Sequence, residues 1–316
     1  LRMNMPATSI RDLVIHENDL VIGTHGRSIW ILDNITPLRA LAKVEEAEHA
    51  FLFEPPTATR VRWNMFGDTP LSPEEPAGEN PPDGAILDYV LTQSASEVML
   101  EVLNGSDLIR RYASDDAPEY VNPTSLRHPT YWIRPPQSLA TERGHHRFVW
   151  NLRHTPPSGS RRSFAIAAVH ARTPVSPVGP LVHPGTYTIR LTVDGIVSER
   201  ELHVRMDPRV EISDEALRLQ TENTMACYRG YLAAQDLREA IEAASLAEGE
   251  QEAWSILCGA RLPGAADTLY GSIYETSPEE ETVMGLQQKF LYMMTLLQQA
   301  DARPTAQAIR AVEQLR

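Results

Sequence analysis

The sequence predicts a mainly β chain with an α-helical tail, because its hydrophobic period changes from two residues to a helical spacing near residue 207. In 185–193 apolar and polar residues alternate, as in a half-buried strand, the apolar row being Tyr187, Ile189, Leu191 and Val193. Asp194-Gly195 then supplies the positive-φ residues of a tight turn, so we expect a hairpin returning from Ile196 to Val204. Together with about seven short strands between 85 and 206, this favours an immunoglobulin-like β-sandwich.

Length and charge exclude some classes of function. The chain has 316 residues and a formal net charge of −13, and residues 211–316 hold 17 acidic and 8 basic side chains. This sign opposes binding to nucleic acid or to an anionic membrane surface. A membrane span is not expected either, because no run of about 18 apolar residues occurs. Cys227 and Cys258 could form one disulfide or remain buried free thiols.

Residues 1–35 predict most of one propeller blade. Three short strands are expected at Ile10–His16, Leu20–Thr24 and Ser28–Leu32, with turn residues between them. Such a blade leaves both of its faces bare unless neighbouring blades or another sheet cover them.

Residues 36–84 are expected to form a linker and a wrap. Leu38–Val44 follows Pro37 and predicts a short helix, and Pro70–Pro82 has the composition of an exposed loop.

Residues 85–206 contain the expected sandwich. Further strands are predicted at Ala85–Leu91, around Val98–Leu103 and at Leu108–Tyr112, and a later strand directs Phe148, Trp150 and Leu152 inward. Two insertions interrupt this pattern. Trp132 caps the sandwich edge in the first, 113–145, and a strand is expected at Ser163–His170 in the second, 154–184.

Residues 207–316 predict a helical hairpin or a three-helix bundle. Ser213 is the expected cap of a first helix carrying Met225, Tyr228 and Leu232 at helical spacing. Ser277-Pro278-Glu279-Glu280 predicts a second helix start with a capping box, followed by an apolar stripe of Val283, Leu286, Phe290, Met293 and Leu297. A last helix is expected after Pro304, with Ile309, Val312 and Leu315 inward.

Several of these motifs resemble the C-terminal part of a bacterial family of secreted BNR/Asp-box, sortilin-type β-propeller proteins that are often named glycosyl hydrolases. The similar segments are 19–33, 80–89, 147–153, 179–187, 206–209 and 301–305. The Asp-box motif itself is absent, and Asn34 and Asn151 stand where the family has Asp. The resemblance implies a secreted or periplasmic protein, a sandwich similar to the flagellar-hook-cap type, and missing propeller blades as partners of residues 1–35. It transfers no catalytic residue, because the family's site lies on the propeller.

His25, Arg27 and Trp30 are the candidate binding residues. A turn that offers an imidazole, a cation and an aromatic surface suits a sugar. The structural interpretation, which we favour, has the two polar side chains bonded to backbone carbonyls while Trp30 packs in the core.

No metal, cofactor or catalytic residue is predicted. Adjacent strand residues point to opposite faces, so His145 and His146 cannot easily share one ion. Glycoside hydrolysis would need a pair of carboxylates, and the candidates on or beside strands are Asp88, Asp33 and Glu101. For Asp88 the expected role is a structural hydrogen bond or ion pair. The loop histidines, His128, His154, His170 and His183, are expected to be solvated.

We therefore expect a non-catalytic C-terminal structural or interaction region of a secreted propeller protein. The alternative is an accessory carbohydrate-binding region or the remnant of a glycoside hydrolase, which an exposed row of Trp30, Trp63 and Trp132 would support. A third class, a protein–protein adaptor using the acidic helices, predicts an exposed apolar stripe on the last helices.

Overall fold

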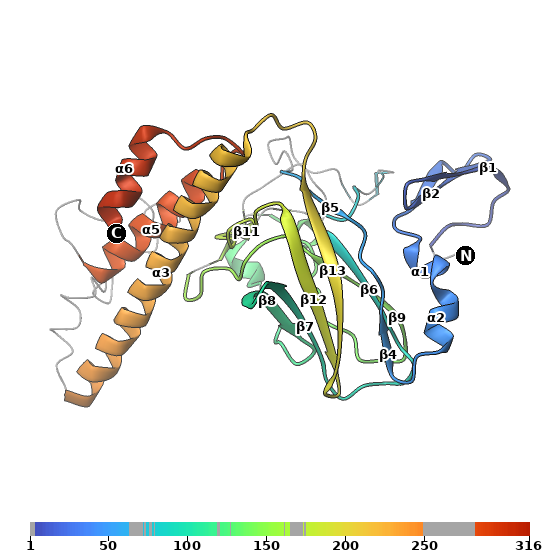
Figure 1. Cartoon of the computed structure of the whole chain (residues 1–316), viewed down its shortest axis with the longest axis horizontal. Coiled ribbons are helices and arrows are strands. Elements are labelled where there is room, and N and C mark those ends of the chain that lie inside the picture. The colour runs from blue at the N-terminus through green and yellow to red at the C-terminus, as the bar shows by residue number, and fades with distance from the viewer. Residues whose placement is uncertain are drawn as a thin grey trace. The chain divides into compact units, whose positions relative to one another are not determined.

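The computed structural model consists mostly of strands in several sheets, with a few helices (Figure 1). It describes residues 4–62, 72, 74, 75, 78, 80–118, 121–126, 128–160, 162–164, 173, 175–248 and 282–316. Among these residues the sheets form neither a closed barrel nor a propeller. No described helix combines the length and the apolarity that crossing a membrane requires.

The chain divides into two compact units. The first unit comprises Leu1–Leu152, Ala168–Arg172 and Pro184–Asp207. The second comprises Arg153–Ala167, Thr173–His183 and Pro208–Arg316. The four-part division expected from the sequence stays a prediction.

The first unit begins with a three-stranded antiparallel sheet in the order β1-β2-β3. Its strands are β1 (Ile10–His16), β2 (Asp19–Thr24) and β3 (Ile29–Leu32), which confirms the three predicted strands. The sheet continues into two short helices, α1 (Thr36–Arg39) and α2 (Leu41–Glu45), where one helix was expected.

A five-stranded sheet contains the predicted hairpin and has the order β5-β13-β12-β7-β8. Its strands are β5 (Ala58–Arg60), β7 (Val98–Asn104), β8 (Asp107–Ala113), β12 (Gly185–Val193) and β13 (Ile196–Met206). Tyr187, Ile189, Leu191 and Val193 are all buried, so the alternation on β12 is confirmed. Asp194 and Gly195 have positive φ and close the turn.

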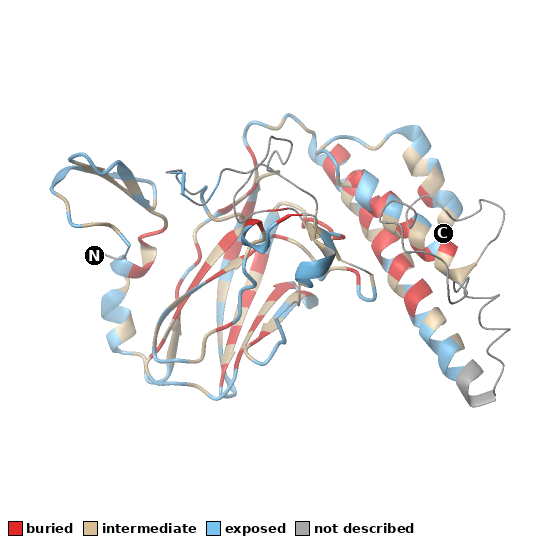
Figure 2. Ribbon diagram, turned by 180° about the vertical axis from the view of Figure 1, so that it is seen from behind, coloured by how far each residue is buried: buried red, intermediate tan, exposed pale blue. Residues whose placement is uncertain are grey.

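Another three-stranded sheet faces the five-stranded sheet and has the order β4-β6-β9. Its strands are β4 (Ala50–Leu52), β6 (Ala85–Leu91) and β9 (Gly144–Trp150). Aromatic pairs join the two sheets: the ring centroids of Tyr112 and Phe148 lie 4.6 Å apart, and those of Trp150 and Tyr187 lie 5.8 Å apart. Buried residues therefore line the inner surfaces of both sheets (Figure 2).

The segment expected to be a linker contributes a strand to each sheet. β4 pairs antiparallel with β6, and β5 pairs parallel with the end of β13. Leu52, Phe53 and Ala58 are buried as a result. Trp132 lies in a short 3₁₀-helix, Thr130–Trp132, where it is buried and stacks on His128.

Gly84 marks a close approach of backbones within the first unit. It has a φ of 135°, and a Cβ at this position would lie 2.0 Å from the carbonyl oxygen of Trp150. Only glycine therefore fits at the start of β6, opposite the end of β9.

In the described part of the second unit, three helices pack around one apolar cluster. They are α3 (Asp214–Glu248), α5 (Val283–Leu297) and α6 (Ala306–Leu315). The buried cluster consists of Cys227, Tyr228, Tyr231, Phe290, Met293, Met294, Leu297 and Val312, and buried positions of α3 and α5 are red in Figure 2.

The predicted helix ends are confirmed in part. The Ser213 hydroxyl accepts a hydrogen bond from the amide of Ala216, and the Thr305 hydroxyl accepts one from Ala308. Thr282 caps α5 in the same way, whereas the predicted start at Ser277 lies outside the described residues. On the predicted stripe of α5, Phe290, Met293 and Leu297 are buried, but Leu286 is exposed.

A loop segment that the sequence placed within the sandwich range packs on α3. The hydroxyls of Tyr228 and Tyr231 donate to the carbonyls of Thr155 and Ser158, each over 2.9 Å. The same segment carries a two-stranded sheet of β10 (Ser163–Phe164) and β11 (Val175–Ser176). Of the strand predicted at Ser163–His170, the residues beyond Phe164 lie outside the described part of the chain.

Candidate functional site

The turn between β2 and β3 carries the three residues singled out from the sequence. The indole Nε1 of Trp30 donates to the carbonyl of Arg27 over 2.7 Å, and the Arg27 amide donates to Thr24 Oγ1. The side chain of Trp30 therefore stabilises the turn, and it is half-buried.

The other two members of this turn present their side chains to solvent. His25 and Arg27 are exposed, and within the described residues neither side chain makes a hydrogen bond or an ion pair. The backbone of His25 is held by the Ser9 carbonyl at 3.0 Å. The described residues thus bring an imidazole, a guanidinium and an indole to one turn, with His25 and Arg27 open to solvent.

A buried carboxylate lies on β6, in the β4-β6-β9 sheet of the first unit. The Asp88 side chain is 1% exposed and faces Arg147, which is its register partner on β9. Arg147 Nε and Nη2 donate to the two carboxylate oxygens over 2.9 and 3.1 Å, and Asn34 Nδ2 donates over 2.8 Å. His145 Nε2 lies 3.3 Å from the same carboxylate.

The same arginine fixes the chain after β3. Arg147 Nη1 donates to the carbonyl of Asp33 over 2.8 Å, and its Nη2 donates to the carbonyl of Asn34 over 3.2 Å. Asn34, which has positive φ, also accepts the Thr36 amide. One guanidinium therefore ties the segment that leaves the first sheet to the strand pair β6–β9.

The carboxylates around this network have perturbed pKa values in opposite directions. Burial acts to raise the pKa of Asp88, but hydrogen bonds from His145 and Arg147 outweigh it and lower the pKa below its ordinary value. Burial and the nearby Asp19 raise the pKa of Asp33, against a smaller opposing effect of Arg147.

This arrangement suits a structural ion pair better than acid–base catalysis. Both oxygens of Asp88 are occupied by donors, so the carboxylate has no free position for a sugar or a water. Glu101 lies on β7 of the other sheet and pairs with Arg190 at 3.4 Å. The expectation that Asp88 takes part in an ion pair is confirmed.

The adjacent histidines on β9, His145 and His146, have different partners. His145 contacts Asp88, whereas His146 packs against the ring of Tyr89 at 5.2 Å, so the two adjacent side chains point to opposite faces as expected. Burial, and secondarily Arg229, lowers the pKa of His154 to about 4. Among the described residues, no three histidine, cysteine or acidic side chains gather as a metal site.

The two loop histidines of the second unit have separate surroundings. His183 Nε2 lies 3.5 Å from Asp214, and His154 packs beside Tyr228 with ring centroids 6.1 Å apart. The expectation of solvated histidines is therefore wrong for His154, and also for His128, which is buried against Trp132. His170 lies outside the described residues.

The exposed tryptophan row that would support the carbohydrate-binding alternative is not assembled by the described residues. Trp30 is half-buried and Trp132 is buried, while Trp63 lies outside the described part.

Of the two cysteines, Cys227 is buried, and burial raises the pKa of its thiol to about 11. Cys258 is outside the described residues, so the alternatives of a disulfide and free thiols both stand.

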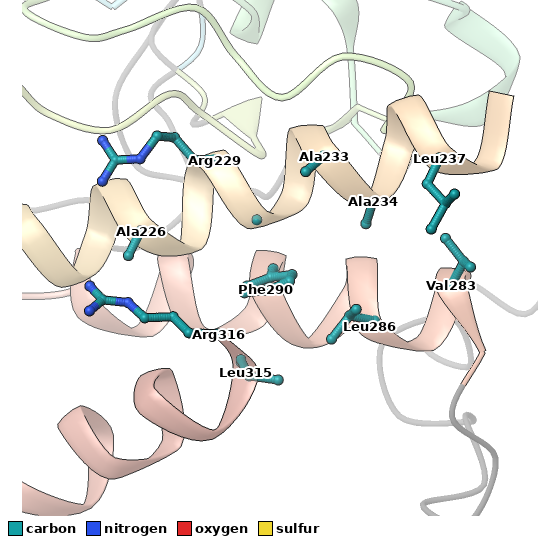
Figure 3. Close-up of a pocket in the computed structure, with 11 residues that line it drawn as sticks. Ala226, Arg229, Ala233, Ala234, Leu237, Val283, Leu286, Phe290, Leu315 and Arg316 are labelled. Atoms are coloured by element: carbon teal, nitrogen blue, oxygen red, sulfur yellow. The ribbon is translucent and has the colours of Figure 1, made fainter. Parts of the chain in front are cut away.

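The second unit contains a groove that the sequence did not indicate. It has a volume of about 650 Å³ and lies between α3, α5 and the end of α6 (Figure 3). Its lining is Ala226, Arg229, Gly230, Ala233, Ala234, Leu237, Val283, Leu286, Phe290, Leu315 and Arg316. The groove forms where three helices pack together, so the periodicity of any one helix could not have located this groove.

Comparisons with protein families, with curated proteins and with solved structures found no match for this chain.

Proposed function

We propose that this chain is the non-catalytic C-terminal structural region of a secreted or periplasmic propeller protein of the sortilin-like, BNR glycosyl hydrolase type. In this proposal residues 1–35 belong to the last blade of a propeller, residues 85–206 form an immunoglobulin-like sandwich, and the C-terminal helices form a bundle. The proposed partners of the first sheet are the remaining blades of the parent protein.

The observation that carries the proposal is the apolar character of both faces of the β1–β3 sheet. Through the strand register, Leu13, Ile22 and Trp30 share one face, while Val14, Val21 and Ile31 share the other. A sheet of this kind is stable only when both faces are covered, as they are between two blades.

The exposed fractions support the same conclusion. Leu13, Val14, Ile15, Ile29 and Ile31 are each at least half exposed, up to 71% for Ile29. Isolated exposed residues would need no explanation, but these five lie on one small sheet and on both of its faces.

The Asp88–Arg147 pair supports a bracing role for the sandwich. Arg147 holds the carbonyls of Asp33 and Asn34, which directly follow β3, and its own charge is balanced by a buried carboxylate. The sandwich therefore anchors the exit of the proposed blade, and this requires no catalytic group.

A double substitution on the sheet tests this function. Val14→Thr with Ile31→Thr should reduce binding of an apolar dye to the chain alone, because it removes exposed apolar surface. In a longer protein carrying the proposed preceding blades, the same change should lower the free energy of unfolding by about 2 kcal/mol, since the side chains would be buried there.

The matched control is Val197→Thr, on the exposed side of β13. It should leave the free energy of unfolding of the longer protein nearly unchanged, because the proposed blades cover only the β1–β3 sheet. The proposal is wrong if the double variant leaves the longer protein as stable as this control does, or if the upstream reading frame encodes no propeller strands.

The alternative function, an accessory carbohydrate-binding or residual glycoside hydrolase region, has one observation in its favour. His25 and Arg27 expose their side chains beside Trp30 on one turn. Retention on insoluble polysaccharides that Arg27→Ala abolishes would support this alternative and count against a purely structural role.

A further inference from the structure

The groove of the second unit is apolar along its length and cationic at one end. Leu237, Val283 and Leu286 lie at one end in Figure 3, with Phe290 between the helices, and Arg229 on α3 and Arg316 after α6 both lie toward the other end. Leu237 and Leu286 are 52% and 38% exposed, so these apolar side chains are available to a ligand.

The two arginines are available for an anionic partner. Arg229 and Arg316 are exposed, and neither guanidinium forms a hydrogen bond or an ion pair within the part of the chain that the structure describes. By contrast, Arg218 on the same helix is paired with Asp214 at 2.6 Å. Two unpaired cations at one end of an apolar groove in an acidic segment are complementary to a short cluster of carboxylates.

The size of the groove favours a peptide over a compact small molecule. Its lining on α3 runs from Ala226 to Leu237, which corresponds to roughly 16 Å along the helix axis. Small-molecule sites usually enclose most of their ligand, whereas this groove runs along the surface for about three helical turns. That length matches the spacing of anchors in helix-in-groove recognition.

We propose that this groove binds an amphipathic helix of a partner protein, with apolar anchors over Leu237, Leu286 and Phe290 and acidic residues beside Arg229 and Arg316. Acidic residues are favourable in the first turn of a helix. The N-terminus of the bound helix therefore lies at the arginine end, and its apolar residues follow at positions three and four apart.

The test uses two synthetic 14-residue peptides that differ in charge alone. Both carry leucines at helical spacing, and the first turn holds three glutamates in one and three glutamines in the other. Fluorescence anisotropy with the whole chain should show about tenfold tighter binding of the glutamate peptide, which corresponds to two exposed ion pairs.

Three variants separate the two parts of the site. Arg229→Gln with Arg316→Gln should make the two affinities equal, whereas Leu286→Asn should weaken both peptides by a similar factor. Arg310→Gln is the matched control, because this arginine on α6 is exposed and does not line the groove, and it should keep the tenfold preference.

The proposal is overturned if neither peptide binds at concentrations up to about 1 mM, or if both bind equally to the unaltered chain. It is also overturned if the preference survives the double arginine substitution. These outcomes are independent of the propeller proposal, because they involve only side chains of the second unit.

Discussion

Arg147 and Asp88 face each other across β9 and β6, with the Arg147 Nε 2.9 Å from Asp88 Oδ1. The carboxylate is buried, and the guanidinium also donates to the two carbonyls that follow β3. The pair thus joins two parts of the first unit that are more than 50 residues apart in sequence.

Replacing Arg147 by Met should destabilise the first unit by about 3 kcal/mol, because it leaves the Asp88 charge buried without its main partner. Denaturant unfolding followed by tryptophan fluorescence measures the change. Arg218→Met is the matched control, since it removes an ion pair whose side chains are 66% and 65% exposed and should cost less than about 1 kcal/mol. Equal effects of the two substitutions would contradict the structural role given to Asp88.

The stability of the second unit should depend on pH through His154. Its pKa is about 4 in the folded chain against an ordinary value of 6.5, so between these values the unfolded chain binds a proton that the folded chain does not. Stability should therefore fall as the pH falls from about 6.5 to about 4, by up to about 3 kcal/mol.

Unfolding curves at several pH values, for the unaltered chain and for His154→Asn, measure this dependence. The difference between the two proteins should be largest near neutral pH and shrink toward pH 4. A difference that is constant over this range would show that the proton affinity of His154 does not change on folding.

Gly230→Ala should destabilise the packing of α3 on α5. A Cβ at Gly230 would lie 2.4 Å from the ring of Phe290, and this clash should outweigh the gain of about 1 kcal/mol that alanine brings to a helix interior. The thermal midpoint measures the net effect. Combining the change with Phe290→Leu should recover part of the loss, and the absence of any recovery would argue against this contact as the cause.

Asp194 should matter for the β12–β13 turn through its acceptor oxygen. Its Oδ1 accepts the amides of Ser96 and Glu97 over 2.9 and 3.0 Å, and its φ is 48°. Asp194→Ala should lower the free energy of unfolding by about 1–2 kcal/mol. Asp194→Asn should cost much less, because asparagine keeps an acceptor and tolerates this backbone conformation. Similar losses for the two variants would contradict this explanation.

Local sequence patterns predicted the elements whose interactions are close in sequence, such as hairpins and helix starts. Alternation on β12 and the Asp194-Gly195 turn specify a hairpin whose partners are close in sequence, and Ser213 specifies a helix start. The parallel pairing of β5 with β13 joins Ala58 to Val204. No local signal encodes such a distant pairing, so the sequence alone predicts a linker where β5 lies.

The candidate sites show the same division. Trp30 and its turn were found because their residues are adjacent in sequence. The environment of Asp88 depends on the register between β6 and β9, and the arginine pair of the groove depends on how α6 packs beside α3. These relationships arise from tertiary packing, so composition and spacing identified Asp88 as a candidate without its partner and missed the groove.

Amide hydrogen exchange of β1 and β3 tests most directly whether other sheets cover the first sheet. The strands should exchange quickly in this chain alone and become strongly protected in a longer protein that carries the proposed preceding blades, while exchange in β12 stays slow in both. Unchanged, rapid exchange of the Val14 and Ile31 segments in the longer protein would contradict the account.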